Sequence, residues 1–280
     1  MLEQITPLIL TYNEAPNIGR TLAALAWARD IVVVDSFSDD ETLEIASSFP
    51  QVRVFQRVFD SHRNQWEFGL RETEIETPWV LALDADYVVT QEALAELKNL
   101  RPDVNTAGYR AKFTYCIHGK KIHSGIYPPV TVLYRREAAA YVQDGHTQRV
   151  VVDGEIEELR SRLLHDDRKW LRRWLDSQAR YAELEAEGIV RRQREALDFQ
   201  TMDFRDRVRT WFVVAPVAML VYCLFVRGGV FDGWRGIFYA SQRALAELLL
   251  SLYLLESRCT FSASTRITAM LQRQSSKTAD

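Results

Sequence analysis

The stretch that most constrains the fold is WVLALDADYVV, residues 79–89, in which an apolar run ends abruptly in two acids. Runs of about 4–8 apolar residues between polar breaks are typical of buried strands. Asp84 and Asp86 therefore stand at a sheet edge, where open α/β folds bind ligands. Carboxylates at such an edge suit Mg²⁺ or Mn²⁺, which also take substrate phosphates. An Asp-rich turn without a metal is the alternative, because D-x-D alone is common.

Strand and helix patterns alternate around this stretch and predict a doubly wound, mostly parallel α/β sheet. The expected strands are residues 5–10, 31–35, 52–57 and the run from residue 79, and the expected helices are 17–27, 41–49, 63–74 and 91–100. Right-handed crossovers bring the strand ends that carry Thr11, Asp35 and Asp84 to the same edge. Further along, residues 110–125 alternate as a β-hairpin does.

Composition excludes several classes of protein. The net charge of −3 has no global basic signature, so we expect no nucleic-acid partner. The three cysteines are far apart and form no C-x-x-C, which disfavours a zinc finger or a disulfide framework and favours a reducing compartment. The N-terminus lacks the pattern of a secretory signal, so we expect the catalytic half to stay in the cytoplasm. There is no G-x-G-x-x-G after the first strand and no P-loop motif, which argues against a dinucleotide-dependent dehydrogenase and a P-loop NTPase.

Four segments in register resemble family 2 glycosyltransferases with the GT-A fold. They are TYNEAPNI (11–18), IVVVDSFSDDET (31–42), HRNQWEFGL (62–70) and WVLALDADYVV (79–89). The chain is most similar to bacterial lipopolysaccharide-core β-glycosyltransferases, over about residues 5–170. The resemblance implies a GT-A nucleotide-sugar and acceptor domain over residues 1–167.

The resemblance also implies a pocket for a nucleotide-sugar donor. Its residues would be Thr11, Tyr12, Glu14, Asp35, Arg63, Asn64 and Asp84. Asp35 would bind the uracil or ribose, although a turn or helix-cap role is the alternative. Arg63 and Asn64 would face the base or the diphosphate, unless they lie on a solvated helix face. Asp84 would bind the ribose or a metal-bound water.

A divalent metal, Mn²⁺ or Mg²⁺, is the cofactor that the resemblance implies. Asp86 would bind it directly, and His165 in LLHDD, after another apolar strand end, would be a further ligand. The alternative for His165 is an ordinary turn histidine. The metal would neutralise the leaving diphosphate.

The general base is the least certain part of the predicted site, because this chain departs from the family there. Alignment on R-V-V-V-D-G puts Gln148 where the family has Glu, and Gln accepts no proton usefully. Asp144 and His146 are the nearest titratable groups, and we prefer Asp144. A simple Asp144-Gly145 turn is the alternative.

Residues 168–256 predict a helical region that associates with a membrane, followed by a polar, flexible tail over 257–280. The segment 168–194 is amphipathic and rich in Arg and Trp, as membrane-surface helices are, although a solvated surface helix has the same pattern. The charge-free run Trp211–Val226 is marginal for a span and contains Pro216. It predicts a kinked helix in the cytoplasmic leaflet, with a buried core helix as the alternative.

Together these features predict an inverting, metal-dependent glycosyltransferase. It would move a hexose from a nucleotide-diphosphate sugar, UDP-linked, to a lipid-linked glycan such as lipopolysaccharide core, at the cytoplasmic face of the inner membrane. A sugar nucleotidyltransferase is one alternative, but TYNEAPN stands where its Gly-rich loop should be. A non-catalytic nucleotide-sugar-binding protein, suggested by Gln148, is the other.

Overall fold

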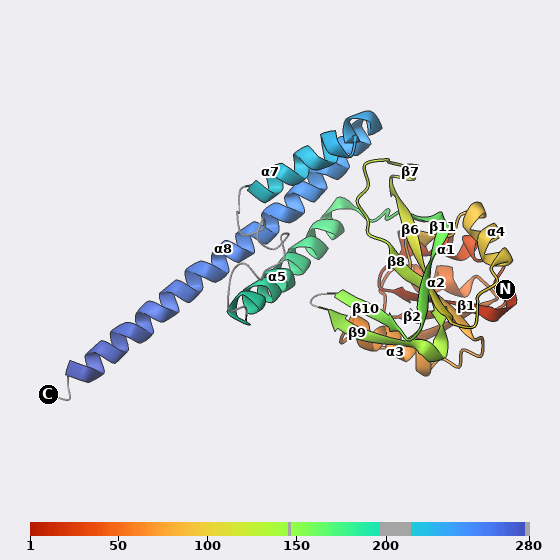
Figure 1. Ribbon diagram of the computed structural model, residues 1–280, viewed down its shortest axis with the longest axis horizontal. Coiled ribbons are helices and arrows are strands. Elements are labelled where there is room, and N and C mark those ends of the chain that lie inside the picture. Colours follow the sequence, from red (N-terminus) through yellow and green to blue (C-terminus); the bar gives the residue numbers. More distant parts are fainter. Residues whose placement is uncertain (145–146, 196–213, 278–280) are drawn as a thin grey trace. The chain divides into compact units, whose positions relative to one another are not determined.

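A computed structural model describes residues 1–144, 147–195 and 214–277, and the side chains of these residues except at 143, 144, 147, 148, 192–195 and 258–277. The chain divides into two compact units, Met1–Trp170 and Leu171–Asp280 (Figure 1). The sequence places the corresponding boundary after residue 167.

The first unit is built on one mixed sheet. The strands are β1 Ile5–Thr11, β2 Ile31–Asp35, β3 Val52–Gln56, β4 Trp79–Asp84, β5 Tyr87–Val88, β6 Thr106–Ile117, β7 Lys120–Lys121, β8 Val130–Arg135, β9 Ala139–Asp144, β10 Thr147–Val152 and β11 Glu155–His165. Within the described chain, the sheet order is β3-β2-β1-β4-β8-β6-β11-β5, with β7 on β6, while β9 and β10 form a separate hairpin. Strands β3, β2, β1 and β4 are mutually parallel, which confirms the predicted α/β fold class.

Helices cover both faces of this sheet. They are α1 Ala15–Ala24, α2 Thr42–Ser47, α3 His62–Arg71 and α4 Gln91–Asn99. Ile31 and Val33 of β2 belong to the apolar cluster that includes α1, α2 and α4. Val32 and Val34 belong to a second cluster, which includes α3 and β9. Burial on both faces explains why the first four positions of β2 are all apolar, as in other parallel sheets.

The predicted hairpin after β6 is confirmed. Strands β6 and β7 pair in antiparallel orientation, and Ile117 is in register with Lys120. The two residues between them, His118 and Gly119, have φ values of 48° and 74°. Positive φ at both positions is what a tight type I′ turn requires.

The second unit consists of helices. They are α5 Leu171–Glu195, α7 Val214–Val221, a short π-helix η4 Tyr222–Val226, a 3₁₀ turn η5 Gly229–Asp232 and α8 Trp234–Lys277. Ala182, Ala186 and Ile189 of α5 pack against Leu250 and Leu254 of α8. None of the helices in the described ranges is long and apolar enough to cross a membrane.

Three details of this unit bear on the expectation. Helix α5, within the amphipathic segment expected over 168–194, begins at Leu171. Pro216 lies inside α7, and the regular α-helical pattern changes at η4, Tyr222–Val226. The backbone of residues 257–277 continues α8 beyond the apolar stretch. The flexibility of that tail stays a prediction.

Candidate active site

The ends of three parallel strands lie side by side at one edge of the sheet. Thr11, at the end of β1, is in register with Asp35, and Leu10 is in register with Asp84. The Thr11 hydroxyl donates a hydrogen bond of 3.0 Å to Oδ1 of Asp35. The polar strand ends therefore meet at the edge where doubly wound sheets bind ligands.

The Asp35 carboxylate is fully buried and holds the loop that follows β2. Its Oδ2 accepts from the Ser38 backbone N–H at 2.8 Å, and its Oδ1 accepts from the Ser38 hydroxyl at 2.5 Å. Both oxygens thus serve the turn, as the turn alternative expects. Contact of Asp35 with a uracil or ribose stays a prediction.

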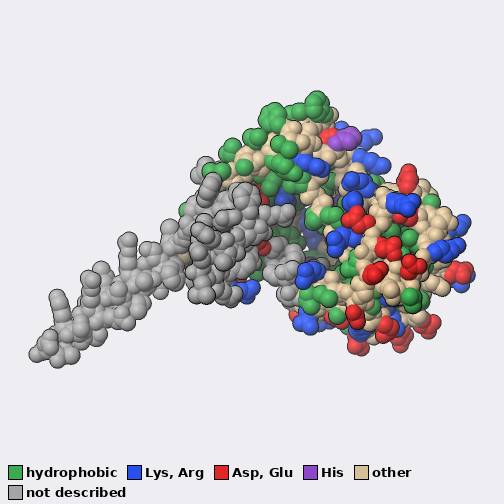
Figure 2. All heavy atoms as spheres, viewed as in Figure 1, with side chains coloured by type: hydrophobic (Ala, Val, Ile, Leu, Met, Phe, Trp, Pro, Cys, Tyr) green, Lys and Arg blue, Asp and Glu red, His purple; other side chains and the backbone are tan. Residues whose placement is uncertain are grey.

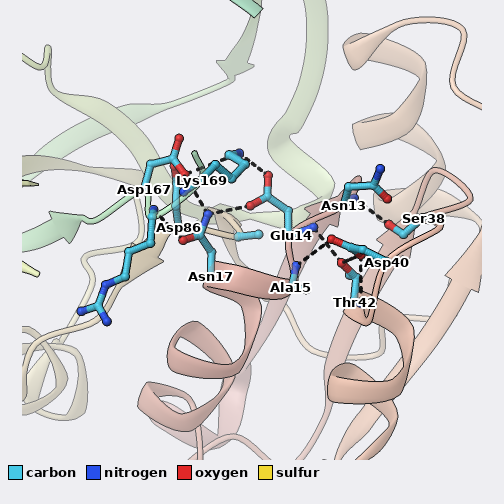
Figure 3. A network of polar contacts seen from close by, with 12 residues as sticks. Asn13, Glu14, Ala15, Asn17, Ser38, Asp40, Thr42, Asp86, Asp167 and Lys169 are labelled. Carbon is cyan, nitrogen blue, oxygen red and sulfur yellow. Dashed lines mark hydrogen bonds and ion pairs between the residues drawn. The ribbon is translucent and has the colours of Figure 1, made fainter. Parts of the chain in front are cut away.

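The loops after β1 and β2 are joined by hydrogen bonds, as Figure 3 shows. The Asn13 N–H donates to the Ser38 hydroxyl at 2.8 Å, and the Asn13 side-chain amide donates to Asp39 at 2.6 Å. The Glu14 N–H donates to the Thr42 hydroxyl at 2.7 Å. These bonds give the first loop one defined conformation, in which Asn13 has a φ of 53°.

Asp86 and His165 are in direct contact, although 79 residues separate them in the sequence. His165 ends β11 and is in register with Tyr87 of β5. Its Nε2 lies 3.1 Å from Oδ2 of Asp86, and the Asp166 N–H donates to the Asp86 carbonyl at 3.0 Å. The structure therefore brings together the two side chains that the sequence predicts as metal ligands.

Three tyrosines surround the His165 ring. The ring centroids of Tyr127, Tyr115 and Tyr87 lie 4.5, 4.7 and 5.4 Å from that of His165, all in edge-to-face orientation. The hydroxyls of Tyr87 and Tyr127 lie 2.5 Å apart. This aromatic wall holds the imidazole in one orientation, with Nε2 directed at Asp86.

Burial dominates the electrostatics of the acid pair Asp84 and Asp86. Burial, and then the charge of Asp86, raises the pKa of Asp84. Burial also penalises the charge of Asp86, but His165 outweighs that effect and lowers the pKa of Asp86. For His165, burial opposes protonation, whereas Asp86 favours it and raises the pKa. Asp86 thus keeps its charge beside a more readily neutralised Asp84.

This donor set fits a divalent cation. Carboxylate oxygen and imidazole nitrogen are ligands that Mn²⁺ accepts. Nδ1 of His165 is buried and has no hydrogen-bond partner within the described chain. A cation would also offset the mutual repulsion of two buried carboxylates. Among the side chains that the structure describes, no group of three or more His, Cys, Asp or Glu is placed to hold a metal.

Lys169 is a charged group at this edge that the sequence does not predict as part of the site. Its Nζ lies 2.6 Å from Glu14 and 3.8 Å from Asp167. The Asn17 amide also donates to both acids, at 2.8 and 2.9 Å (Figure 3). Burial raises the pKa of Glu14 to about 7, although Lys169 opposes the shift. Burial lowers the pKa of Lys169, but Glu14, Asp167 and Asp86 outweigh it, so the net shift is upward.

Asp166 and Asp167, which follow His165 in the sequence, each accept a hydrogen bond from another part of the chain. Asp166 accepts from the Gly119 N–H at 3.1 Å and forms an ion pair of 2.9 Å with Arg168. The Arg20 guanidinium donates to the Asp166 carbonyl at 2.7 Å. This cluster anchors the segment after β11 to α1 and to the β6–β7 turn.

The remaining residues that are predicted to bind the nucleotide-sugar donor lie at exposed positions. The Tyr12 side chain is 52% exposed, on the loop after β1. Arg63, in the first turn of α3, donates to the Tyr141 carbonyl at 3.0 Å, and Asn64 donates to Asp60 at 3.0 Å. Helix α3 follows β3, so its N-terminus lies at the edge where the parallel strands end.

Neither candidate base has a described side chain. Asp144 ends β9, and the structure describes its backbone only. His146 lies outside the described residues. The choice between them stays a prediction.

Comparison with known proteins assigns the segment that carries most of this edge. Residues 8–101 match the family model described as glycosyl transferase family 2. An uncharacterized glycosyltransferase of Rickettsia bellii (strain RML369-C) is 30% identical over 112 residues, which are 40% of this chain and 37% of that protein. Residues 8–101 thus form a segment of glycosyl transferase family 2, as the motifs predict.

Two solved structures are also similar. Staphylococcus aureus TarS 1–349 in complex with UDP-GlcNAc has 14% identity, coverage of 92% of each chain and a TM-score of 0.48. Glucosyl-3-phosphoglycerate synthase from Mycobacterium tuberculosis, in complex with Mn²⁺, UDP and phosphoglyceric acid, has 14% identity, coverage of 68% of this chain and 78% of that one, and a TM-score of 0.45.

Proposed function

We propose that this chain is an inverting, metal-dependent glycosyltransferase that moves a hexose from a nucleotide-diphosphate sugar, UDP-linked, to a lipid-linked glycan such as lipopolysaccharide core. One observation carries the proposal: Nε2 of His165 lies 3.1 Å from Asp86 at the edge where β1, β2 and β4 end. Most of that edge lies in the family 2 segment. The sugar nucleotidyltransferase alternative has no comparable support.

The donor would lie along the strand ends. Thr11 and Asp35 at the strand ends, with Tyr12 and Glu14 just after β1, would face the base and ribose. Arg63 and Asn64 would face the base or diphosphate. Asp86 and His165 would hold Mn²⁺ or Mg²⁺, and Asp84 would contact the ribose or a metal-bound water. When bound, the metal would supply positive charge against the leaving diphosphate. Such ions commonly take few protein ligands together with substrate phosphates.

The proposed step is a single displacement at the anomeric carbon. The acceptor hydroxyl oxygen forms the new bond, and the bond from the anomeric carbon to the donor phosphate oxygen breaks. The nucleoside diphosphate leaves with the electron pair, and a base takes the hydroxyl proton. We assign that base to Asp144, with His146 as the second candidate. A direct displacement inverts the configuration at the anomeric carbon.

The acceptor and location form a finer part of the proposal. We assign the acceptor to lipid-linked glycans at the cytoplasmic face of the inner membrane. The support is the second unit, where α7 and the turns that follow carry exposed apolar side chains, among them Val217, Phe225 and Val226. An enzyme whose acceptor is freely soluble would have no use for such a surface.

A donor screen tests the function. Thermal shift with UDP-, GDP- and ADP-sugars, with and without Mn²⁺, should show the largest stabilisation with a UDP-sugar plus Mn²⁺, because a ligand that prefers the folded state raises its stability. Release of UDP from that donor should follow. UDP binding without turnover on any acceptor would instead support the non-catalytic alternative. Near wild-type turnover of both Asp144→Asn and His146→Ala would refute the base assignment.

A further inference from the structure

The turn between α7 and α8 exposes large apolar side chains on its outer surface. The set comprises Phe225, Val226, Val230, Phe231, Trp234 and Ile237, named here the apolar tip. Phe231 is 90% exposed, and Val226 and Phe225 are 69% and 66% exposed. Figure 2 shows hydrophobic side chains gathered over this end of the helical hairpin. Contiguous exposed apolar surface of this kind marks an interaction site.

The chain holds the apolar tip in a defined conformation. A Cβ at Gly236 would lie 1.9 Å from the Gly229 carbonyl oxygen, so α8 approaches the turn at glycine distance. Gly228 and Gly233 have φ values of 72° and 61°, which favour glycine. The Phe231 N–H donates to the Gly228 carbonyl at 2.9 Å. The tip side chains are therefore exposed by a turn whose backbone conformation is fixed by glycines and a hydrogen bond.

Basic side chains accompany the apolar tip. Within residues 225–237, the span that carries the tip, the chain has two arginines, Arg227 and Arg235, and one acid, Asp232. The Arg235 guanidinium lies 4.7 Å from the Trp234 ring centroid. Arginine and tryptophan suit the boundary between acyl chains and headgroups, because each combines an apolar body with a polar end. Excess positive charge adds attraction to anionic lipids.

We propose that the apolar tip is a docking surface for an anionic lipid bilayer. Phe225, Val226 and Phe231 enter the boundary between headgroups and acyl chains, and Arg227 and Arg235 contact the headgroup phosphates. The charge complementarity favours this occupant over a second copy of the chain, whose tip would bring the same arginines together. The proposal deepens the membrane location proposed above, on which it rests, but it does not depend on glycosyl transfer.

Vesicle flotation of the full chain tests the proposal. Wild type should float with phosphatidylcholine vesicles that contain phosphatidylglycerol, and binding should weaken with added salt. The double variant Phe225→Ser/Phe231→Ser should lose about tenfold or more in partitioning, because it removes two exposed anchors. Arg227→Gln/Arg235→Gln should lose binding to the anionic vesicles selectively.

Matched controls make the result specific. Val104 and Leu252 are 90% and 53% exposed but lie outside the tip, so Val104→Ser/Leu252→Ser should float as wild type does. Unchanged flotation of Phe225→Ser/Phe231→Ser, or equal binding of wild type to neutral and anionic vesicles, would overturn the proposal. So would a dimer that this variant disperses, without vesicle binding, because the tip would then be a self-association surface.

Discussion

The two units of this chain place their side chains in opposite ways. In the first unit, acids at the sheet edge are buried or half-buried, and each is paired: Glu14 with Lys169, Asp86 with His165 and Asp35 with Ser38. In the second unit, side chains such as Phe231 and Trp234 are large, apolar and exposed. The first arrangement offers charged and polar groups, which would suit a polar, charged ligand. The second leaves apolar surface that only a partner outside the described chain would cover.

The largest expected effect is on the polar edge. Asp86→Asn keeps the shape of the side chain but removes its charge, so turnover of the donor sugar should fall about 100-fold or more. The melting temperature should stay close to that of wild type. Steady-state release of the nucleoside diphosphate measures the change, with the exposed Asp103→Asn as the control. If Asp86→Asn kept turnover within a few-fold of wild type, the negative charge of Asp86 would not be required for glycosyl transfer.

The next effect tests whether α8 packs closely against the turn that carries the apolar tip. Gly236→Ala would place a Cβ 1.9 Å from the Gly229 backbone oxygen, which cannot move without opening the turn. We expect a loss of about 3 kcal/mol in the free energy of unfolding, measured with urea. Ser241→Ala, an exposed change on the same helix, should be near neutral. Equal stability of the two variants would show that the turn is not close-packed.

A smaller effect depends on pH. The pKa of Glu14 is raised from 4.5 to about 7, chiefly by burial. Because the folded-state pKa is the higher one, the stability from this proton is complete below about pH 4.5 and is lost as pH rises through 7. Glu14→Gln should therefore gain stability relative to wild type between about pH 5 and pH 8, on the order of 2 kcal/mol. Thermal unfolding across that range measures the difference. A constant difference would contradict the shifted pKa.

The smallest effect tests how the polar edge is anchored. The buried Thr21 hydroxyl of α1 donates to the Ala85 carbonyl, between the two acids, at 2.7 Å. Thr21→Val removes the donor and should lower the free energy of unfolding by about 1–2 kcal/mol. Thr131→Val, on the half-buried strand β8, is the control and should change it little. Equal urea midpoints for the two variants would show that the bond contributes nothing.

Local pattern was sufficient for much of the fold. IVVVD and WVLALD are strands because each is a buried apolar run up to its terminal acid, and these acids lie where right-handed crossovers place them. The contact of His165 with Asp86 also agrees with the pairing that the sequence predicts. For the two strands the signal lies in the local apolar run, whereas for His165 it comes from the resemblance to the glycosyltransferase family.

The partners of Lys169 and Arg63 could not be predicted from the sequence. Lys169 and Glu14 are 155 residues apart, and nothing local distinguishes that lysine from a solvated one. Its position directly after the LLHDD strand end was the one available signal. Arg63 likewise contacts the Tyr141 carbonyl, because the β9–β10 hairpin packs against α3, a contact set by tertiary structure.

Direct titration of Mn²⁺ in the presence and absence of UDP tests the central claim, that Asp86 and His165 form the metal end of a nucleotide-sugar site. UDP should strengthen Mn²⁺ binding to wild type, because metal and diphosphate would share one site. His165→Ala and Asp86→Asn should each weaken Mn²⁺ binding about tenfold or more, with the fold intact. Mn²⁺ binding that neither substitution changes, or that UDP does not strengthen, would contradict the account.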